Sequence, residues 1–266
     1  MGVKIFQGWK ALKGKGQSMG FALSCFIECH TGRREAARGE AGRQCCSRKG
    51  CRTEVWGMNQ VNYQRELDKI IDALERGMAE PPSLFLHSCC APCSSYVLEY
   101  LRTYFRITVF YFNPNISLEE EYRKRVAEQK RLIAAYNEEG ETGSGFPIVV
   151  AEGDYEPERF FEMAKGLENC PEGGERCFGC FELRLRETAA RGREGCFDYF
   201  ATTLTISPLK NARKINEIGK ALSQEYGIAW LPSDFKKKDG YKRSIELSAR
   251  YGLYRQDYCG CTYSRR

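Results

Sequence analysis

From residue 62 onward, short apolar segments alternate with longer segments of helical period, and this alternation constrains the fold more than any other feature of the chain. Tyr63, Leu67, Ile70, Ile71 and Leu74, for example, recur at helical spacing. The expected order in the first half is helix 63–77, strand 83–87, a helix around residues 97–101, strand 107–112, helix 117–136 and strand 146–151. Strands separated by helices pair in parallel, so the pattern predicts an α/β fold.

The second half of the chain is more helical. Ser117 and Glu120 form a capping box that predicts where the long helix of the first half begins. Beyond it we expect helices over 157–166, 181–190, 210–226 and 244–251, and strands over 197–202 and 228–231. No internal repeat is visible after Met58. We therefore predict one domain, residues 58–266, with a parallel sheet and a helical C-terminal half.

Residues 1–57 differ from the rest in charge and patterning. They hold 11 Lys and Arg against 4 Asp and Glu, which leaves 30 basic and 31 acidic residues for the remainder of a chain of net charge +6. Neither a helical nor a strand period is sustained there, and an Arg-rich stretch of this kind buries too little apolar surface to fold. We expect this segment to be disordered, or not to be translated, since Met58 opens the periodic region directly.

Two cysteine motifs in the body have the spacing of metal ligands. Cys89-Cys90-x2-Cys93 follows the first strand, where ligands of a parallel sheet collect, and Cys177-x2-Cys180 precedes a predicted helix. The amide-rich start of that helix would stabilise thiolates. Two thiolates from each segment make four ligands, and the spacing leaves open whether they hold zinc or an iron–sulfur cluster.

The Cys259–Cys261 motif, Cys196 and His87 can each have either a functional or a purely structural role. Tyr258 is followed by Cys259-Gly260-Cys261, and one residue between two thiols suits a strained, easily reduced disulfide. The alternatives are further metal ligands or an inert tail. Cys196 is expected to be an inert buried thiol, and His87, at the end of a strand, a packed residue rather than a ligand.

Several blocks of residues follow one another in order from about Asn62 to Tyr263, and nothing before Met58 belongs to them. The blocks are Phe85-Leu86-His87-Ser88-Cys89-Cys90-Ala91-Pro92-Cys93, Tyr111-Phe112-Asn113-Pro114-Asn115-Ile116, Glu121-Tyr122-x2-Arg125-x2-Glu128-Gln129, Arg176-Cys177-x2-Cys180, Thr202-Thr203-Leu204-x2-Ser207-Pro208, Asp234-Phe235-Lys236-Lys237-Lys238, Tyr241-x-Arg243-Ser244 and Tyr254-Arg255-Gln256-x-Tyr258-Cys259-Gly260-Cys261. In these blocks the chain resembles the QueH-type epoxyqueuosine reductases.

This resemblance implies reduction of epoxyqueuosine to queuosine at the wobble base of tRNA, without cobalamin, by an enzyme with a Rossmann-like sheet related to the nucleotide α-hydrolases. It implies a redox-active disulfide between Cys259 and Cys261. Some members carry a separate metal ion, for which Cys93 and Asp154 are candidate ligands. Cys170 has no assigned role. The [4Fe-4S] cluster that it implies would be held by four cysteines: Cys89, Cys90, Cys177 and Cys180.

A tRNA substrate requires cations for its phosphates and a pocket for the unstacked base. Residues 234–243 contain five cations and two aromatic residues and are our candidate contact segment. Cations also occur on the predicted helix 117–136, where we expect a solvated face. They are Arg123, Lys124, Arg125, Lys130 and Arg131.

The location and the electron supply follow from the same reasoning. No run of about 18 apolar residues exists, which excludes a membrane-spanning helix. Six redox-assigned cysteines require a reducing compartment, the cytoplasm. The electron donor is not identified by the sequence.

Alternative functions explain fewer of these residues. Cys90-Ala91-Pro92-Cys93 between a strand and a helix is also typical of thioredoxin-like thiol oxidoreductases, but that function leaves Cys89 and the Cys177/Cys180 pair unused. A zinc-stabilised RNA-binding module would explain the four cysteines but not the tail. An ATP-using tRNA thiolase lacks support, because the loop after the first strand is cysteine-rich rather than rich in glycine and serine.

Overall fold

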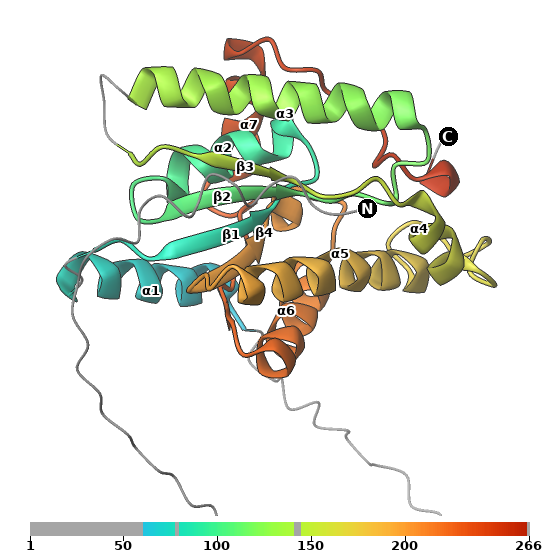
Figure 1. Ribbon diagram of the computed structural model, residues 1–266, viewed down its shortest axis with the longest axis horizontal. Helices are drawn as coiled ribbons and strands as arrows, with labels where there is room; N and C mark the ends of the chain where they lie inside the picture. Colours follow the sequence, from blue (N-terminus) through green and yellow to red (C-terminus); the bar gives the residue numbers. More distant parts are fainter. Residues whose placement is uncertain (1–60, 78–79, 141–144, 265–266) are drawn as a thin grey trace, which may run out of the picture. The chain divides into compact units, whose positions relative to one another are not determined.

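The predicted alternation of strands and helices is present in the computed structural model, which describes residues 61–77, 80–140 and 145–264 (Figure 1). The helices and 3-10 turns of this part are α1 (Tyr63–Gly77), α2 (Ala91–Leu101), α3 (Glu119–Gly140), α4 (Pro157–Ala164), α5 (Glu175–Glu194), η2 (Thr203–Ile206), α6 (Ala212–Tyr226), α7 (Gly240–Arg250) and η3 (Thr262–Ser264). The extension predicted over residues 1–57 lies outside the described residues.

Five parallel strands form the sheet. β1 (Ser83–His87) is central and pairs with β2 (Arg106–Tyr111) on one side and with β4 (Tyr199–Thr202) on the other. β3 (Val149–Glu152) extends the sheet beyond β2, and β5 (Ala229–Trp230) extends it beyond β4. The order β3-β2-β1-β4-β5 reverses direction between β1 and β4 and is that of a doubly wound, Rossmann-like sheet. The predicted α/β class is confirmed.

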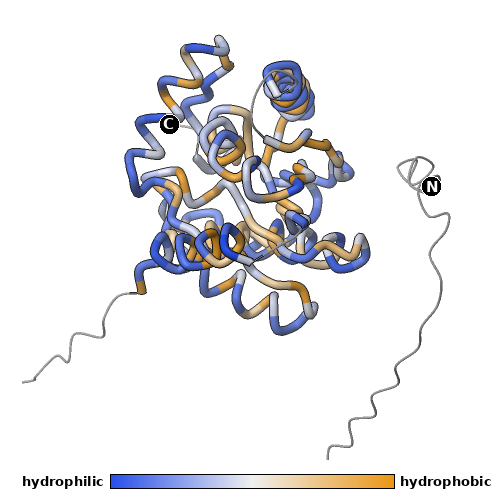
Figure 2. Tube along the Cα trace, turned by 90° about the vertical axis from the view of Figure 1, so that its left-hand side faces the viewer, coloured by the Kyte–Doolittle hydropathy of each residue, from blue (hydrophilic) through white to orange (hydrophobic). Residues whose placement is uncertain are grey.

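Helices cover both faces of the sheet, and the alternation of side chains along each strand explains the two cores. Leu84 and Leu86 of β1 pack in one cluster with residues of α2 and α3. Phe85, between them, points to the opposite face, where it stacks on Phe110 at 4.9 Å between ring centroids and packs with α5 and α6. Hydrophobic stretches accordingly concentrate in the middle of the fold, and hydrophilic ones on the outer turns of the helices (Figure 2).

The helix boundaries differ from the predicted ones where cysteines are involved. α2 begins at Ala91, so Cys93 lies in its first turn rather than in a loop. α5 begins at Glu175, so Cys177 and Cys180 both lie within the helix. In both places tertiary contacts extend the helix beyond what the apolar period indicates.

The predicted capping box at Ser117 is wrong. α3 begins at Glu119, and the Ser117 hydroxyl accepts a hydrogen bond at 3.1 Å from the backbone N–H of Thr262. The side chain thus binds the C-terminal segment instead of its own helix. A contact between residues so far apart in the sequence cannot be read from local spacing.

Cys196 is also not the buried thiol that we expected. Its side chain is exposed, and its backbone is in the left-handed region at φ 54°, just beyond the end of α5. In the part of the chain that the structure describes, no helix is long and apolar enough to cross a membrane.

Candidate active site

The cysteine motif after β1 lies at the carboxyl edge of the sheet, where the strand order reverses. β1 ends at His87 and its neighbour β4 ends at Thr202, so the next residues of both strands meet at this edge. The Cys89 Sγ lies 3.6 Å from the Thr203 hydroxyl, which follows β4. In doubly wound sheets the crevice at the reversal point is where ligands bind.

Three thiols converge in this crevice. The Sγ atoms of Cys89, Cys90 and Cys93 lie within 4.8 Å of one another, and those of Cys89 and Cys90 are 3.9 Å apart. A hydrogen bond from the Cys90 thiol, with a second from Cys93, holds the pKa of Cys89 well below its usual range. Donating that bond raises the pKa of Cys90 to about 12, and the pKa of Cys93 is raised as well. Cys89 is therefore the most acidic of the three thiols.

Buried polar groups hold the cysteine segment in place. Gln129 of α3 accepts hydrogen bonds from the hydroxyls of Ser88, at 2.7 Å, and Ser94, at 2.9 Å. Asn113, after β2, donates to the Ser88 carbonyl at 2.8 Å. His87 is fully buried between the Thr202 hydroxyl and the Phe112 carbonyl, which confirms it as a packed residue.

The second motif lies in the first two turns of α5. Cys177 Sγ accepts a hydrogen bond from the backbone N–H of Gly173 at 3.2 Å. Cys180 is buried, and burial raises its pKa to about 11. The preceding loop is held by the buried Arg176, which donates to three carbonyls, among them that of Cys170 at 2.6 Å. Cys170 thus contributes its backbone to the loop.

The Cys259-Gly260-Cys261 tail is bound to the loop between β2 and α3. Asn115 Nδ2 and the Arg125 guanidinium both donate to the Cys259 carbonyl, at 3.1 and 3.3 Å. Gly260 has φ +99°, and a Cβ there would lie 2.7 Å from the Ile116 side chain, so only glycine fits. A hydrogen bond from the Cys261 thiol lowers the pKa of Cys259 well below its usual range.

Two cations link the three cysteine segments. Lys210, half-buried after η2, lies within electrostatic reach of Cys89, Cys93 and Cys259; burial would lower its pKa, but interaction with these cysteines raises it. Arg184 of α5 is 3% exposed and donates to the Cys180 carbonyl. Among the residues that the structure describes, neither cation pairs with a carboxylate. An unpaired buried charge is costly, so the site favours an anionic occupant.

Sequence reasoning missed Lys210, Arg184 and Gln129, and it misjudged Arg125. Arg125 is 2% exposed rather than on a solvated face, and it pairs with Glu121 at 2.6 Å. The other cations predicted on this face pair with carboxylates or, like Lys124, lie over an aromatic ring. The available signal was the Glu121-x3-Arg125 spacing, which places both side chains on one helix face.

The remaining candidates lie apart from the thiols or are partly neutralised. Asp154 is exposed. In the segment 234–243, Lys236, Lys238 and Arg243 form ion pairs with Asp234, Asp68 and Glu99. Of its two aromatic residues, Phe235 is buried in the core and Tyr241 is exposed.

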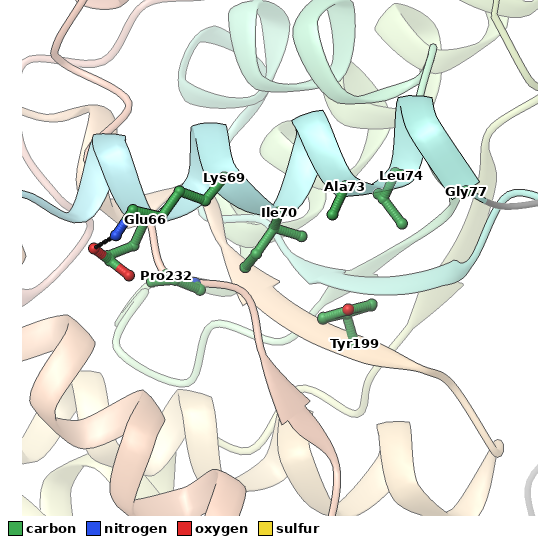
Figure 3. A pocket seen from close by; sticks show the side chains of 8 residues that line it. All are labelled: Glu66, Lys69, Ile70, Ala73, Leu74, Gly77, Tyr199 and Pro232. Atoms are coloured by element: carbon green, nitrogen blue, oxygen red, sulfur yellow. Dashed lines mark hydrogen bonds and ion pairs between the residues drawn. The ribbon is translucent and has the colours of Figure 1, made fainter.

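A groove of about 440 Å³ lies elsewhere in the fold, between α1 and the β4–β5 edge (Figure 3). Ile70 and Leu74 of α1 line it opposite Tyr199 and Pro232. Tyr199 is the first residue of β4, so the groove reaches the amino end of the strand, whereas the thiols lie at the carboxyl ends. It contains no cysteine, and we assign it no part in the chemistry.

The fold and this site define a doubly wound α/β protein with three thiols that could hold a metal ion at the carboxyl edge of its sheet. The family model described as epoxyqueuosine reductase QueH matches residues 84–266. The chain therefore belongs to the QueH family of epoxyqueuosine reductases.

Three named relatives illustrate the similarity, and each is called epoxyqueuosine reductase QueH. The protein of Staphylococcus epidermidis is 45% identical over 77% of this chain and 85% of its own. The protein of Streptococcus pyogenes is 42% identical over 78% of this chain and 79% of its own. The protein of Thermotoga maritima is 33% identical over 68% of this chain and 90% of its own. The match favours the reductase over the thioredoxin-like and zinc-module alternatives.

Proposed function

We propose that this chain reduces the epoxide of epoxyqueuosine in tRNA to the alkene of queuosine, using an iron–sulfur cluster and the Cys259/Cys261 dithiol. The observation that carries the proposal is the gathering of three cysteine segments around Lys210 in a member of the QueH family. We place the reaction in the reducing cytoplasm, where such thiols stay active.

The donor set fits a cluster ligated by Cys89, Cys90, Cys177 and Cys180. A [4Fe-4S] cluster with four thiolates is an anion, and the buried Arg184, which donates to the Cys180 carbonyl, is a cation that pairs with no carboxylate among the described residues. The Gly173 N–H donates a hydrogen bond to the sulfur of Cys177, one of the proposed ligands. Hydrogen bonds of this kind orient the ligands of a metal centre and tune it. When bound, the cluster supplies single-electron transfer and Lewis acidity. Cys93, the third thiol of its segment, is our candidate ligand for a separate metal ion.

The tail dithiol supplies the electron pair. Removing the epoxide oxygen takes two electrons and two protons: both C–O bonds break, the alkene forms, and the oxygen leaves as water. Oxidation of the two thiols to a disulfide releases two electrons and two protons, so the reaction balances. Cys259 loses its proton first, because its pKa is the lower of the pair. An external reductant must then reduce the disulfide, and its identity is open.

Nucleoside analysis of tRNA from a strain lacking this gene tests the function. We expect epoxyqueuosine to accumulate and queuosine to disappear, provided that no second reductase is present. Normal queuosine in a strain without another reductase would refute the proposal.

The roles of the cysteines are tested on protein purified without oxygen. We expect about four iron and four sulfide ions per chain in the wild type and much less in a Cys177→Ser variant. Cys259→Ser should keep its iron but fail at multiple turnovers. Exposed Cys196→Ser is the matched control and should behave as the wild type. Full multiple-turnover activity of Cys259→Ser would exclude the dithiol role.

A further inference from the structure

Acidic side chains are exposed in two of the segments that adjoin the cysteine site. Glu120 lies in the first turn of α3, directly after the loop that binds the tail, and its neighbour Glu119 is paired with Arg123. Glu172 and Glu175 flank the turn before Cys177. A polyanion is repelled from surfaces of this sign. RNA phosphates should therefore avoid these two segments.

The α6 side of the site is different. Lys210 precedes this helix, Lys214 lies in its first turn, and among the described residues neither pairs with a carboxylate. The Lys214 Nζ lies 5.6 Å from the centroid of the Phe178 ring, which stands between Cys177 and Cys180. Leu209 is 70% exposed beside Lys210. We call Phe178, Leu209, Lys210 and Lys214 the α6 rim.

Cations with an aromatic ring and an exposed apolar side chain are what unpaired RNA requires. Phosphates bind to lysines that have no other counter-ion, and unstacked bases bind on aromatic faces. In the segment 234–243, by contrast, three of the five cations are already paired with carboxylates. Neutralised lysines add little to the attraction of RNA. The α6 rim thus places cations that pair with no described carboxylate next to the second cysteine motif, since Lys214 lies over the ring of Phe178.

We propose that the anticodon loop of the substrate tRNA binds on the α6 rim, with phosphates on Lys210 and Lys214 and an unpaired base next to the reacting nucleoside on Phe178. This inference rests on the proposed function for the identity of the RNA. It adds the direction of approach: the loop enters from the α6 side, and its backbone stays clear of Glu172 and Glu175.

The test is binding of a fluorescent anticodon stem-loop RNA to the full chain, measured by anisotropy between about 50 and 200 mM salt. Lys210→Met and Lys214→Met should each weaken binding about threefold to tenfold and make the slope of log affinity against log salt shallower by about 0.7 to 0.9. Phe178→Leu should weaken binding about fivefold or more without changing the slope, because stacking releases no counter-ions.

The matched control is Lys220→Met, which removes an exposed lysine farther along the same helix and should leave both affinity and slope unchanged. Lys214→Arg keeps the charge and should restore the slope, which separates the loss of a phosphate contact from a folding defect. If Lys210→Met and Lys214→Met bind as Lys220→Met does, the α6 rim is not the docking surface, while the proposed reaction stands. If the wild type binds no stem-loop at all, both the docking surface and the proposed function are refuted.

Discussion

At the scale of single residues, His87 shows how the fold suppresses an ionisation. The side chain is fully buried, and burial, with a smaller contribution from the charge of Arg184, lowers its pKa to about 3. The imidazole is therefore neutral at physiological pH and orients the end of β1 through Thr202 and Phe112. Because His87 is neutral and both of its ring nitrogens have hydrogen-bond partners, it supports the structure of the site and does not act as a proton donor.

This burial predicts a pH dependence of stability. Unfolded histidine has a pKa of about 6.5, so below that pH the unfolded chain binds a proton that the folded chain refuses. The free energy of unfolding should fall by up to about 1.4 kcal/mol per pH unit between about pH 6.5 and 5. In His87→Asn this part of the slope should vanish, as measured by urea unfolding at several pH values. Equal slopes in both proteins would contradict the prediction.

Cys196 carries a strained backbone that glycine would relieve. At φ 54° its Cβ is disfavoured, whereas the neighbouring Gly195 has an ordinary φ of −79°. Cys196→Gly should raise the free energy of unfolding by about 1 kcal/mol in urea titrations. Cys196→Ala, which loses the thiol but keeps the Cβ, is the control and should give no such gain. A similar gain from alanine would assign the effect to the thiol.

At the scale of elements, α3 is the support of the whole site. Gln129 binds the serines beside the cysteine segment, and Arg125 donates to the carbonyls of Tyr258 and Cys259. Farther along, Glu128 accepts from the backbone N–H of Tyr254 at 2.7 Å. One helix thus fixes both the first cysteine segment and the tail, so the separation of the two thiol groups depends on it.

Removing Arg125 should therefore release the tail. Arg125→Met removes the ion pair with Glu121 and the hydrogen bonds to the carbonyls of Tyr258 and Cys259, and we expect a loss of about 3 kcal/mol of stability. Cys259 should also react faster with iodoacetamide, as followed by peptide mapping. Arg123→Met, on the same helix but exposed, is the matched control and should change stability by less than about 0.5 kcal/mol. Unchanged labelling of Cys259 would show that Arg125 does not hold the tail.

The glycine between the tail thiols allows a second test at this scale. Gly260→Ala meets both a positive φ and the Ile116 side chain, whereas Gly252→Ala meets a positive φ and open space. Both should lose about 1 to 2 kcal/mol of stability, but only Gly260→Ala should reduce turnover, by about tenfold or more, since small displacements of a reacting group are costly. Ile116→Ala added to Gly260→Ala should restore part of the activity. Equal turnover in the two single variants would argue against the fitted tail.

At the scale of the whole molecule, cluster binding should be linked to folding. The proposed ligands come from the β1–α2 junction and from α5, two parts of the fold that lie far apart in the sequence. Joining them adds the binding free energy to the stability of the fold. Reconstitution with iron and sulfide under anaerobic conditions should raise the melting temperature of the wild type by several degrees, and Cys177→Ser should lose this increase. An equal increase in Cys177→Ser would exclude it as a ligand.

The parallel α/β sheet, the order of its elements and the cysteine motifs can all be predicted from the sequence, because apolar periods and residue spacing are local properties. The positions of β1, α6 and the packed His87 needed nothing else. Only the folded chain shows that Arg125 is buried, that Ser117 binds Thr262, and that Lys210 lies near three cysteine segments. Those contacts join residues far apart in the chain, and their energies depend on burial, which no local pattern encodes.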